Sequence, residues 1–175
     1  MTTPGRRARA AVDDAELIQA EQDVQARIGD LDIDFTAMAV VSNVFRVASA
    51  ARNHFERTVL AEHELSFTAF TVLWVLWVWG EQEARHLAAE AGITKGTLTG
   101  VVSTLEKRGL VERLPHATDR RLVIVRATAA GERTMRGLFP RFNQGESAIV
   151  ADLDEADRST LAASLRQVLR TLEQL

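Results

Sequence analysis

The spacing of apolar residues predicts a chain built mainly from amphipathic helices. Residues 13–29 repeat apolar positions at helical spacing, and Gly29 suits the end of that helix. A longer helix is predicted from Phe35 to about Ala61. Its apolar stripe consists of Val41, Val44, Ala48, Ala51, Phe55 and Val59. Residues 71–79 are apolar on all sides, which is typical of a short helix buried against several neighbours.

The hydrophobic period changes in the middle of the chain. Two short helices are predicted at 85–91 and 95–108, and two runs rich in β-branched residues follow at 110–114 and 122–127. Residues 115–121 form the loop between these two strands. The order helix, turn, helix, strand, loop, strand predicts a winged helix-turn-helix.

Two more helices complete the predicted fold. Thr128 is a typical cap for a helix that begins at Ala129, in which Pro140 should cause a kink or a break near Phe139. Asp154 opens the last helix. The apolar seam of that helix consists of Leu161, Leu165, Val168, Leu169 and Leu172. The predicted fold class is therefore mainly α, with a small wing sheet of two to three strands.

The two short helices carry the small and apolar positions that a tight crossing needs. Gly92 lies in the turn, where a left-handed backbone costs a residue with a Cβ about 1 kcal/mol or more. Thr94 is expected to cap the second helix, and Ser66 the helix that precedes the pair. The residues expected to pack between the helices are Leu87, Ala88, Ala91, Ile93, Leu98 and Val101.

The opposite side of helix 95–108 carries short or cationic side chains. The candidates for DNA binding are Lys95, Thr97, Thr99, Gly100, Ser103 and Thr104. Threonine methyls can touch thymine methyls, and hydroxyls can bond bases or phosphates. A solvated helix face would have a similar composition, but the wing that follows in register favours DNA recognition.

The loop between the strands presents Asp119, Arg120 and Arg121. An arginine on a thin β-loop can enter the minor groove, where negative potential is concentrated. Arg120 and Arg121 are therefore candidates for DNA binding, and Asp119 is expected to brace an arginine rather than to read a base. The alternative is a hairpin turn with solvated charges.

Charge is unevenly distributed along the chain. Residues 94–126 contain seven basic and three acidic residues, whereas residues 13–34 contain one basic and eight acidic residues. A local basic region on a chain of net charge −3 fits a protein that touches DNA with one region only. Residues 1–12 are expected to form a disordered basic tail.

Composition argues against several other classes of protein. The chain has no cysteine and four scattered histidines, so neither disulfides nor a metal site are expected. The sequence shows no glycine-rich phosphate loop and no catalytic triad, so neither an enzyme nor a cofactor is expected. The longest apolar run is far short of the ~20 residues of a membrane helix, and no secretory signal is recognisable. A cytoplasmic protein without membrane contact is expected.

At the central motif the chain resembles the MarR family of bacterial transcription regulators. The residues that carry this resemblance read HLAAEAGITKGTLTGVVSTLEKRGLVER, then DRRLVIVRAT in the wing, then AAGER in the next helix. The resemblance implies a homodimer on a pseudo-palindromic operator in double-stranded DNA, with half-sites about one helical turn apart. It also implies dimerisation helices at 35–66 and 129–175, a DNA-binding domain at 67–128, and an additional N-terminal helix and linker at 13–34.

Members of this family are commonly repressors released by a small aromatic or phenolic molecule. The resemblance suggests a ligand site with Arg52, Trp74 and Trp77, in which the arginine holds a carboxylate and the tryptophans stack on a ring. Alternatively, the tryptophans belong to the core and Arg52 pairs with an acid of the partner subunit, since an arginine on a buried stripe needs an anionic partner. Gly100, at a position often basic in relatives, and the acidic N-terminal segment keep open a second function, a winged-helix protein–protein module without DNA binding.

Overall fold

The computed structural model describes residues 14–116, 118–119 and 121–175, and it divides into two compact units that meet in sequence between Ser49 and Ala50. The first unit contains α1 (Asp14–Ile28) and the beginning of α2 (Phe35–Arg57). Asn43 of α2 donates a hydrogen bond of 2.9 Å to Glu21 of α1. The helix predicted at 13–29 is therefore confirmed, and the predicted basic tail lies outside the described residues.

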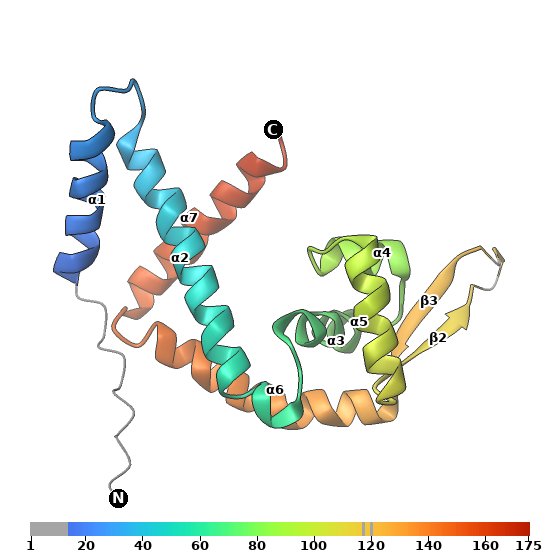
Figure 1. The fold of residues 1–175 in the computed structure, drawn as a ribbon. Coiled ribbons are helices and arrows are strands. Elements are labelled where there is room, and N and C mark those ends of the chain that lie inside the picture. Colours follow the sequence, from blue (N-terminus) through green and yellow to red (C-terminus); the bar gives the residue numbers. More distant parts are fainter. Residues whose placement is uncertain (1–13, 117, 120) are drawn as a thin grey trace, which may run out of the picture. The chain divides into compact units, whose positions relative to one another are not determined.

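The second unit contains the end of α2 and all later elements (Figure 1). In chain order these are a 3-10 turn (Ala61–His63), α3 (Phe67–Trp79), β1 (Gln82–Glu83), α4 (Ala84–Glu90), α5 (Lys95–Lys107), β2 (Val111–Pro115), β3 (Val123–Ala127), α6 (Ala129–Ile149) and α7 (Glu155–Leu172). Helices dominate, which confirms the predicted fold class. Within the described part of the chain, no helix combines the length and the hydropathy that a bilayer crossing requires.

Four helices begin at a capping side chain that the sequence predicts. Ser66, Thr94, Thr128 and Asp154 each have an extended backbone, and each side-chain oxygen accepts a hydrogen bond from the backbone N–H three residues later. These bonds satisfy N–H groups that have no partner within the helix, which is why short polar residues are favoured at this position. The starts of α3, α5, α6 and α7 are thus determined by local sequence.

The wing is part of a three-stranded antiparallel sheet in the order β1–β3–β2. In the hairpin, Val111 pairs with Ala127 and Pro115 pairs with Val123. Strand β1 pairs Gln82 with Val125, and so ties the start of α4 to the wing. Two residues are too few to show a strand pattern. The sequence therefore predicted two to three strands but did not predict where the third would lie.

The core of the second unit is built around α3. Leu73 of this helix is fully buried, as are Leu87 of α4, Leu105 of α5 and Met135 and Leu138 of α6. The expectation that 71–79 is buried throughout is wrong at its end, where the side chain of Trp79 is 53% exposed. The last residues of α3, Val78 and Trp79, are therefore exposed.

The α6 helix runs without interruption from Ala129 to Ile149 and contains Pro140. The sequence predicted a kink or a break near Phe139, and no break occurs there. Met135 and Phe142, on either side of the proline, are both buried in the core. Their burial outweighs the local cost of about 3 kcal/mol that proline imposes inside a helix.

The α2 helix ends at Arg57, earlier than its apolar stripe suggests. Its buried residues continue through Val59 and Leu60 into the turn that follows. The N–H of Leu60 bonds to the carbonyl of Phe55 at 3.0 Å, which closes the helix one turn before the apolar pattern stops.

Candidate nucleic-acid interface

The turn between α4 and α5 has the geometry of a helix-turn-helix. Gly92 has φ +63°, in the left-handed region that favours glycine. The N–H of Ile93 bonds to the carbonyl of Ala88 at 2.9 Å, and the side chains of Leu87 and Leu98 are buried between the helices. This packing fixes which side of α5 faces outward.

The outward side of α5 presents most of the candidate DNA-binding residues together. Lys95, Thr97, Thr99, Gly100 and Thr104 are all exposed. A Cβ added at Gly100 would meet nothing within 4 Å, so the middle of this face is open space. The structure therefore provides a face of small side chains with a single cation at its N-terminal end.

The hydroxyl groups on α5 are already bonded within the helix. Thr99 donates to the carbonyl of Lys95 at 2.9 Å, and Thr104 donates to the carbonyl of Gly100 at 3.1 Å. Thr97 shares a hydrogen bond of 3.0 Å with the capping hydroxyl of Thr94. Because a hydroxyl has one hydrogen, Thr99 and Thr104 present a methyl group and acceptor lone pairs outward.

Ser103 differs from the threonines because it is half-buried beside the wing. Its hydroxyl accepts a hydrogen bond of 3.2 Å from Arg113 of β2. The same guanidinium donates to the carbonyl of Thr99 at 3.3 Å and forms an ion pair with Glu106. Arg113 thus joins the wing to the recognition helix. The sequence does not reveal this role, because no local spacing relates a strand residue to three positions on the preceding helix.

At the tip of the wing, Asp119 holds Arg121. The Asp119 carboxylate accepts from the backbone N–H of Arg121 at 3.0 Å and from its guanidinium at 3.1 and 2.9 Å. The hydrogen bonds from the side chain of Arg121, followed by the one from its backbone, hold the pKa of Asp119 below its ordinary value. The pair is therefore ionised at neutral pH, and the Arg121 side chain remains 89% exposed. Arg120 lies outside the described residues.

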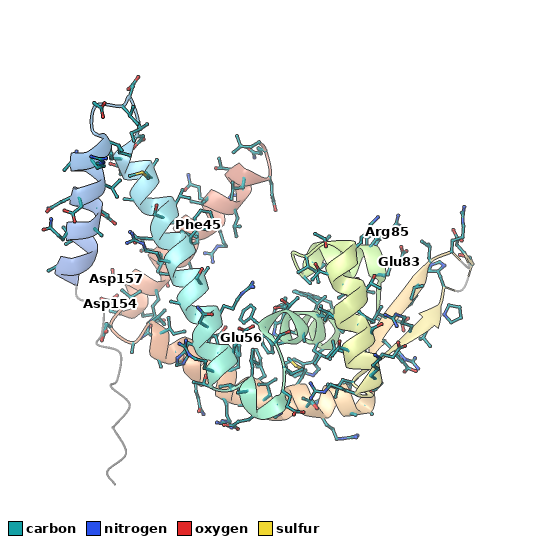
Figure 2. All side chains as sticks on the ribbon, in the orientation of Figure 1. Phe45, Glu56, Glu83, Arg85, Asp154 and Asp157 are labelled. Carbon is teal, nitrogen blue, oxygen red and sulfur yellow. The ribbon has the colours of Figure 1, made fainter. Side chains whose placement is uncertain are left out.

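A second charged cluster connects β1, α4 and the wing. Glu83 lies 2.8 Å from the Nε of Arg85, and 3.9 Å from the Nε2 of His116 at the end of β2 (Figure 2). The other ring nitrogen of His116 accepts from the backbone N–H groups of Thr118 and Asp119 at 3.3 and 3.2 Å. His116 therefore links the wing loop to the start of α4.

A hollow of about 320 Å3 lies beside this cluster, between α5 and the loop end of the wing. Its charged residues include Arg85, Lys95 and Arg121, which come from α4, α5 and the wing loop. Its apolar residues include Leu98 and Val123. Glu83 also lines the hollow and pairs with Arg85, and Arg121 pairs with Asp119. Lys95 is therefore the lining cation that can best hold a phosphate at the rim while leaving the floor for apolar contact.

Arg108, at the end of α5, bonds to the turn that follows α2. Its guanidinium donates to the carbonyls of His63 and Glu64, both at 2.7 Å. Arg141 of α6 holds the same turn through a two-point ion pair with Glu62. The turn is therefore fixed to the recognition helix and to α6 by one arginine from each.

Among the described residues, the three candidate ligand residues each make a ring or cation–π contact with a different aromatic side chain. Arg52 is exposed, and its guanidinium carbon lies 5.1 Å from the ring centroid of Phe67. An aromatic face also attracts a cation, and the pairing of Arg52 with an acid of a partner subunit stays a prediction. Trp74 packs edge-on against Trp79 at 4.9 Å, and Trp77 packs against Phe139 at 5.5 Å.

Comparison with known proteins agrees with this geometry. Residues 65–123 match the family model of the MarR family. The chain is 32% identical over 160 residues to the uncharacterized HTH-type transcriptional regulator YwaE of Bacillus subtilis, covering 90% of this chain and 94% of YwaE. NadR in complex with 4-hydroxyphenylacetate is 25% identical, with a TM-score of 0.65 over 77% of this chain and 97% of NadR.

A further solved structure shares the fold. BpsR of Bordetella bronchiseptica, whose DNA binding is regulated by 6-hydroxynicotinic acid, is 24% identical to this chain. The two superpose with a TM-score of 0.68, over 74% of this chain and 97% of BpsR. The matched family segment, 65–123, runs from the start of α3 to the start of β3 and contains the whole helix-turn-helix.

Proposed function

This chain belongs to the MarR family of winged helix-turn-helix transcription regulators, and on that premise we propose that it is a homodimeric repressor, released from its operator by a small aromatic or phenolic acid. The observation that carries the DNA-binding part is the pairing of an open, exposed α5 face with an exposed wing arginine held by Asp119. In this proposal α5 enters the major groove and Arg121 enters the adjacent minor groove. Residues 67–128 are then the DNA-binding domain.

The wing provides the first test of this proposal. Replacing Arg121 by alanine is expected to weaken binding to the operator by about tenfold and to reduce the salt dependence by about one phosphate contact. The measurement is a fluorescence titration at several salt concentrations, on a fragment from upstream of the protein's own gene identified by footprinting. Arg133→Ala removes an exposed arginine from α6 and serves as the matched control.

Unchanged affinity in Arg121→Ala would contradict the wing mechanism. If footprinting at low salt protects no sequence, the DNA-binding proposal fails, and the alternative of a protein–protein module gains support. Both variants should unfold at the temperature of the natural chain, because both arginines are exposed and Arg121 bonds only to its own loop among the described residues.

The proposal of a dimer rests on apolar seams that a single chain leaves exposed. In the first unit, α2 exposes Val41, Val44 and Phe45, the last with 68% of its surface accessible (Figure 2). In the second unit, the seam of α7 exposes Leu165 and Leu169, among others. Seams of this length on a monomer would be unusual, and helices 35–66 and 129–175 are therefore proposed to dimerise.

The proposed ligand site rests on Arg52 and the aromatic residues around it. The guanidinium lies on Phe67, whose ring is 6.4 Å from that of Phe142. An exposed arginine over aromatic rings has the chemistry to bind a carboxylate attached to a ring. Trp74 and Trp77, only partly buried on α3, are proposed to complete this site.

The response to ligand provides a test of Arg52. We expect 4-hydroxyphenylacetate or 6-hydroxynicotinic acid to release the operator, and Arg52→Ala to raise the concentration required by about tenfold, as loss of a charge-assisted bond implies. DNA affinity without ligand should change by less than about twofold, because Arg52 is not on α5 or the wing. Arg46→Ala, at an exposed position earlier on α2, is the control.

Two other outcomes would contradict the proposed ligand site. A lower unfolding temperature or loss of the dimer in Arg52→Ala would show that its contact with Phe67 is structural. If neither acid releases the natural protein from DNA, the proposal of an aromatic acid effector is contradicted, while the DNA-binding proposal stands.

A further inference from the structure

The chemistry that α5 offers to DNA is unusual for a recognition helix. Among its exposed candidates only Lys95 carries a charge, and it lies in the first turn. Arginine, asparagine and glutamine, which form bidentate bonds with bases, are absent from the range 95–107, and the lysines, which can also bond a guanine, lie only at its two ends, Lys95 and Lys107. Reading by paired hydrogen bonds is thus unavailable along most of the helix.

The Thr99 hydroxyl has no free hydrogen to donate to a base. Its hydroxyl hydrogen is directed to the carbonyl of Lys95 at 2.9 Å, while its side chain stays exposed. The carbonyl of Thr99 is in turn held by Arg113 of the wing at 3.3 Å. The hydroxyl and the carbonyl of Thr99 are therefore both held by hydrogen bonds, and the side chain presents its γ-methyl group to the solvent.

The surroundings of Thr99 are suited to an apolar group. Thr99 lines the hollow between α5 and the wing together with Leu98, Leu122 and Val123. Val123 is 38% exposed there, and Lys95 and Arg85 bring positive charge to the rim, where Glu83 pairs with Arg85. Next to Thr99, Gly100 leaves open space for the close approach of a base edge. An apolar surface inside a cationic rim matches a thymine methyl inside a phosphate backbone.

We infer that Thr99 determines operator specificity by contacting the C5 methyl group of a thymine in the major groove. This inference rests on the proposed DNA-binding function and states what that function recognises. The cations position the backbone, whereas the threonine methyl distinguishes thymine from bases without a methyl group. Specificity at this position comes from apolar contact.

Deoxyuridine tests this inference, because it differs from thymidine only by that methyl group. Each thymine of the footprinted site is replaced in turn, and affinity is measured for the natural protein, Thr99→Ser and Thr99→Val. For the natural protein, replacing the contacted thymine in one half-site should weaken binding about fourfold, the factor expected for burying one methyl group, and replacing it in both half-sites about fifteenfold. Thr99→Ser removes the methyl group from both subunits, so it should bind normal DNA about fifteenfold more weakly and lose its sensitivity to that replacement.

Thr99→Val keeps a methyl group and loses the hydroxyl. It should bind within about twofold of the natural protein and remain sensitive to deoxyuridine. Thr134→Ser is the control on α6, because the Thr134 hydroxyl makes the same kind of bond, to Ala130 at 3.0 Å. It should leave the deoxyuridine profile unchanged.

Two outcomes would overturn the inference. A site that is protected but insensitive to deoxyuridine at all positions would exclude the methyl contact and leave the proposed function intact. Strong loss of binding in Thr99→Val with retention in Thr99→Ser would show that the hydroxyl reads the base. If no sequence is protected at all, the proposed function itself fails. Unfolding temperatures of the variants show whether any loss of binding is a loss of fold.

Discussion

Leu165→Glu is expected to convert the protein to a monomer and to weaken operator binding by about a hundredfold or more. Leu165 lies in the exposed seam of α7, where a proposed partner would bury it. An unpaired carboxylate buried in an apolar interface costs several kcal/mol. A monomer holds one half-site at a time and loses the gain of 10²–10⁴ that linked binding provides. Light scattering after size exclusion, and titration of a two-half-site fragment, give the two measurements.

The control for this prediction lies on the same helix. Gln167→Glu adds the same charge about 160° away from Leu165 around α7, at 100° per residue. It should leave both the dimer and the DNA affinity unchanged. A Leu165→Glu protein that stays dimeric would place the interface elsewhere, and circular dichroism would show whether the separated monomer retains its helices.

Gly131→Ala is expected to lower the free energy of unfolding by about 2–3 kcal/mol, as overpacking at a rigid site does. A Cβ at this position would lie 2.1 Å from the carbonyl oxygen of Leu110 and 3.1 Å from its carbon. Backbone atoms cannot rotate away as a flexible side chain can. The first turn of α6 must therefore move off the corner between α5 and β2. Urea unfolding followed by circular dichroism measures the change.

Gly137 provides the matched control within α6. A Cβ there meets nothing within 4 Å, so Gly137→Ala should raise the free energy of unfolding by about 1 kcal/mol through helix propensity alone. Opposite signs for the same substitution in one helix would attribute the effect at Gly131 to its contact with Leu110. Equal destabilisation at both positions would contradict this explanation.

The sequence predicted those features whose causes are local. The four caps and the turn at Gly92 depend on residues within three or four positions of one another, and all five are confirmed. The candidate face of α5 also follows from helical period, although what each residue does there stays a prediction. The pairing of Asp119 with Arg121 is similarly local, since only two positions separate them.

Features that depend on distant contacts could not be predicted in the same way. Arg108 and Glu64 are 44 residues apart, and their bond depends on how α5 meets the turn after α2. The continuous helix through Pro140 depends on burial of residues around it, which overrides a local penalty. The contact of Arg52 with Phe67 was not foreseen either, because the sequence gives the position of Arg52 on a stripe but not the half-buried ring beside it.

The two ends of the wing are joined to each other as well as to the helices. The N–H of Thr128 bonds to the carbonyl of Leu110 at 3.0 Å, and its hydroxyl bonds to the carbonyl of Gly109 at 2.6 Å. These bonds hold the two ends of the hairpin together at its base, independently of the loop at its tip. Doubling the length of such a loop costs only about 0.6 kcal/mol in closure entropy. Mutation can therefore lengthen, shorten or recharge the tip with little effect on folding, so the wing can diverge between descendants of this protein while the helices beneath it stay the same.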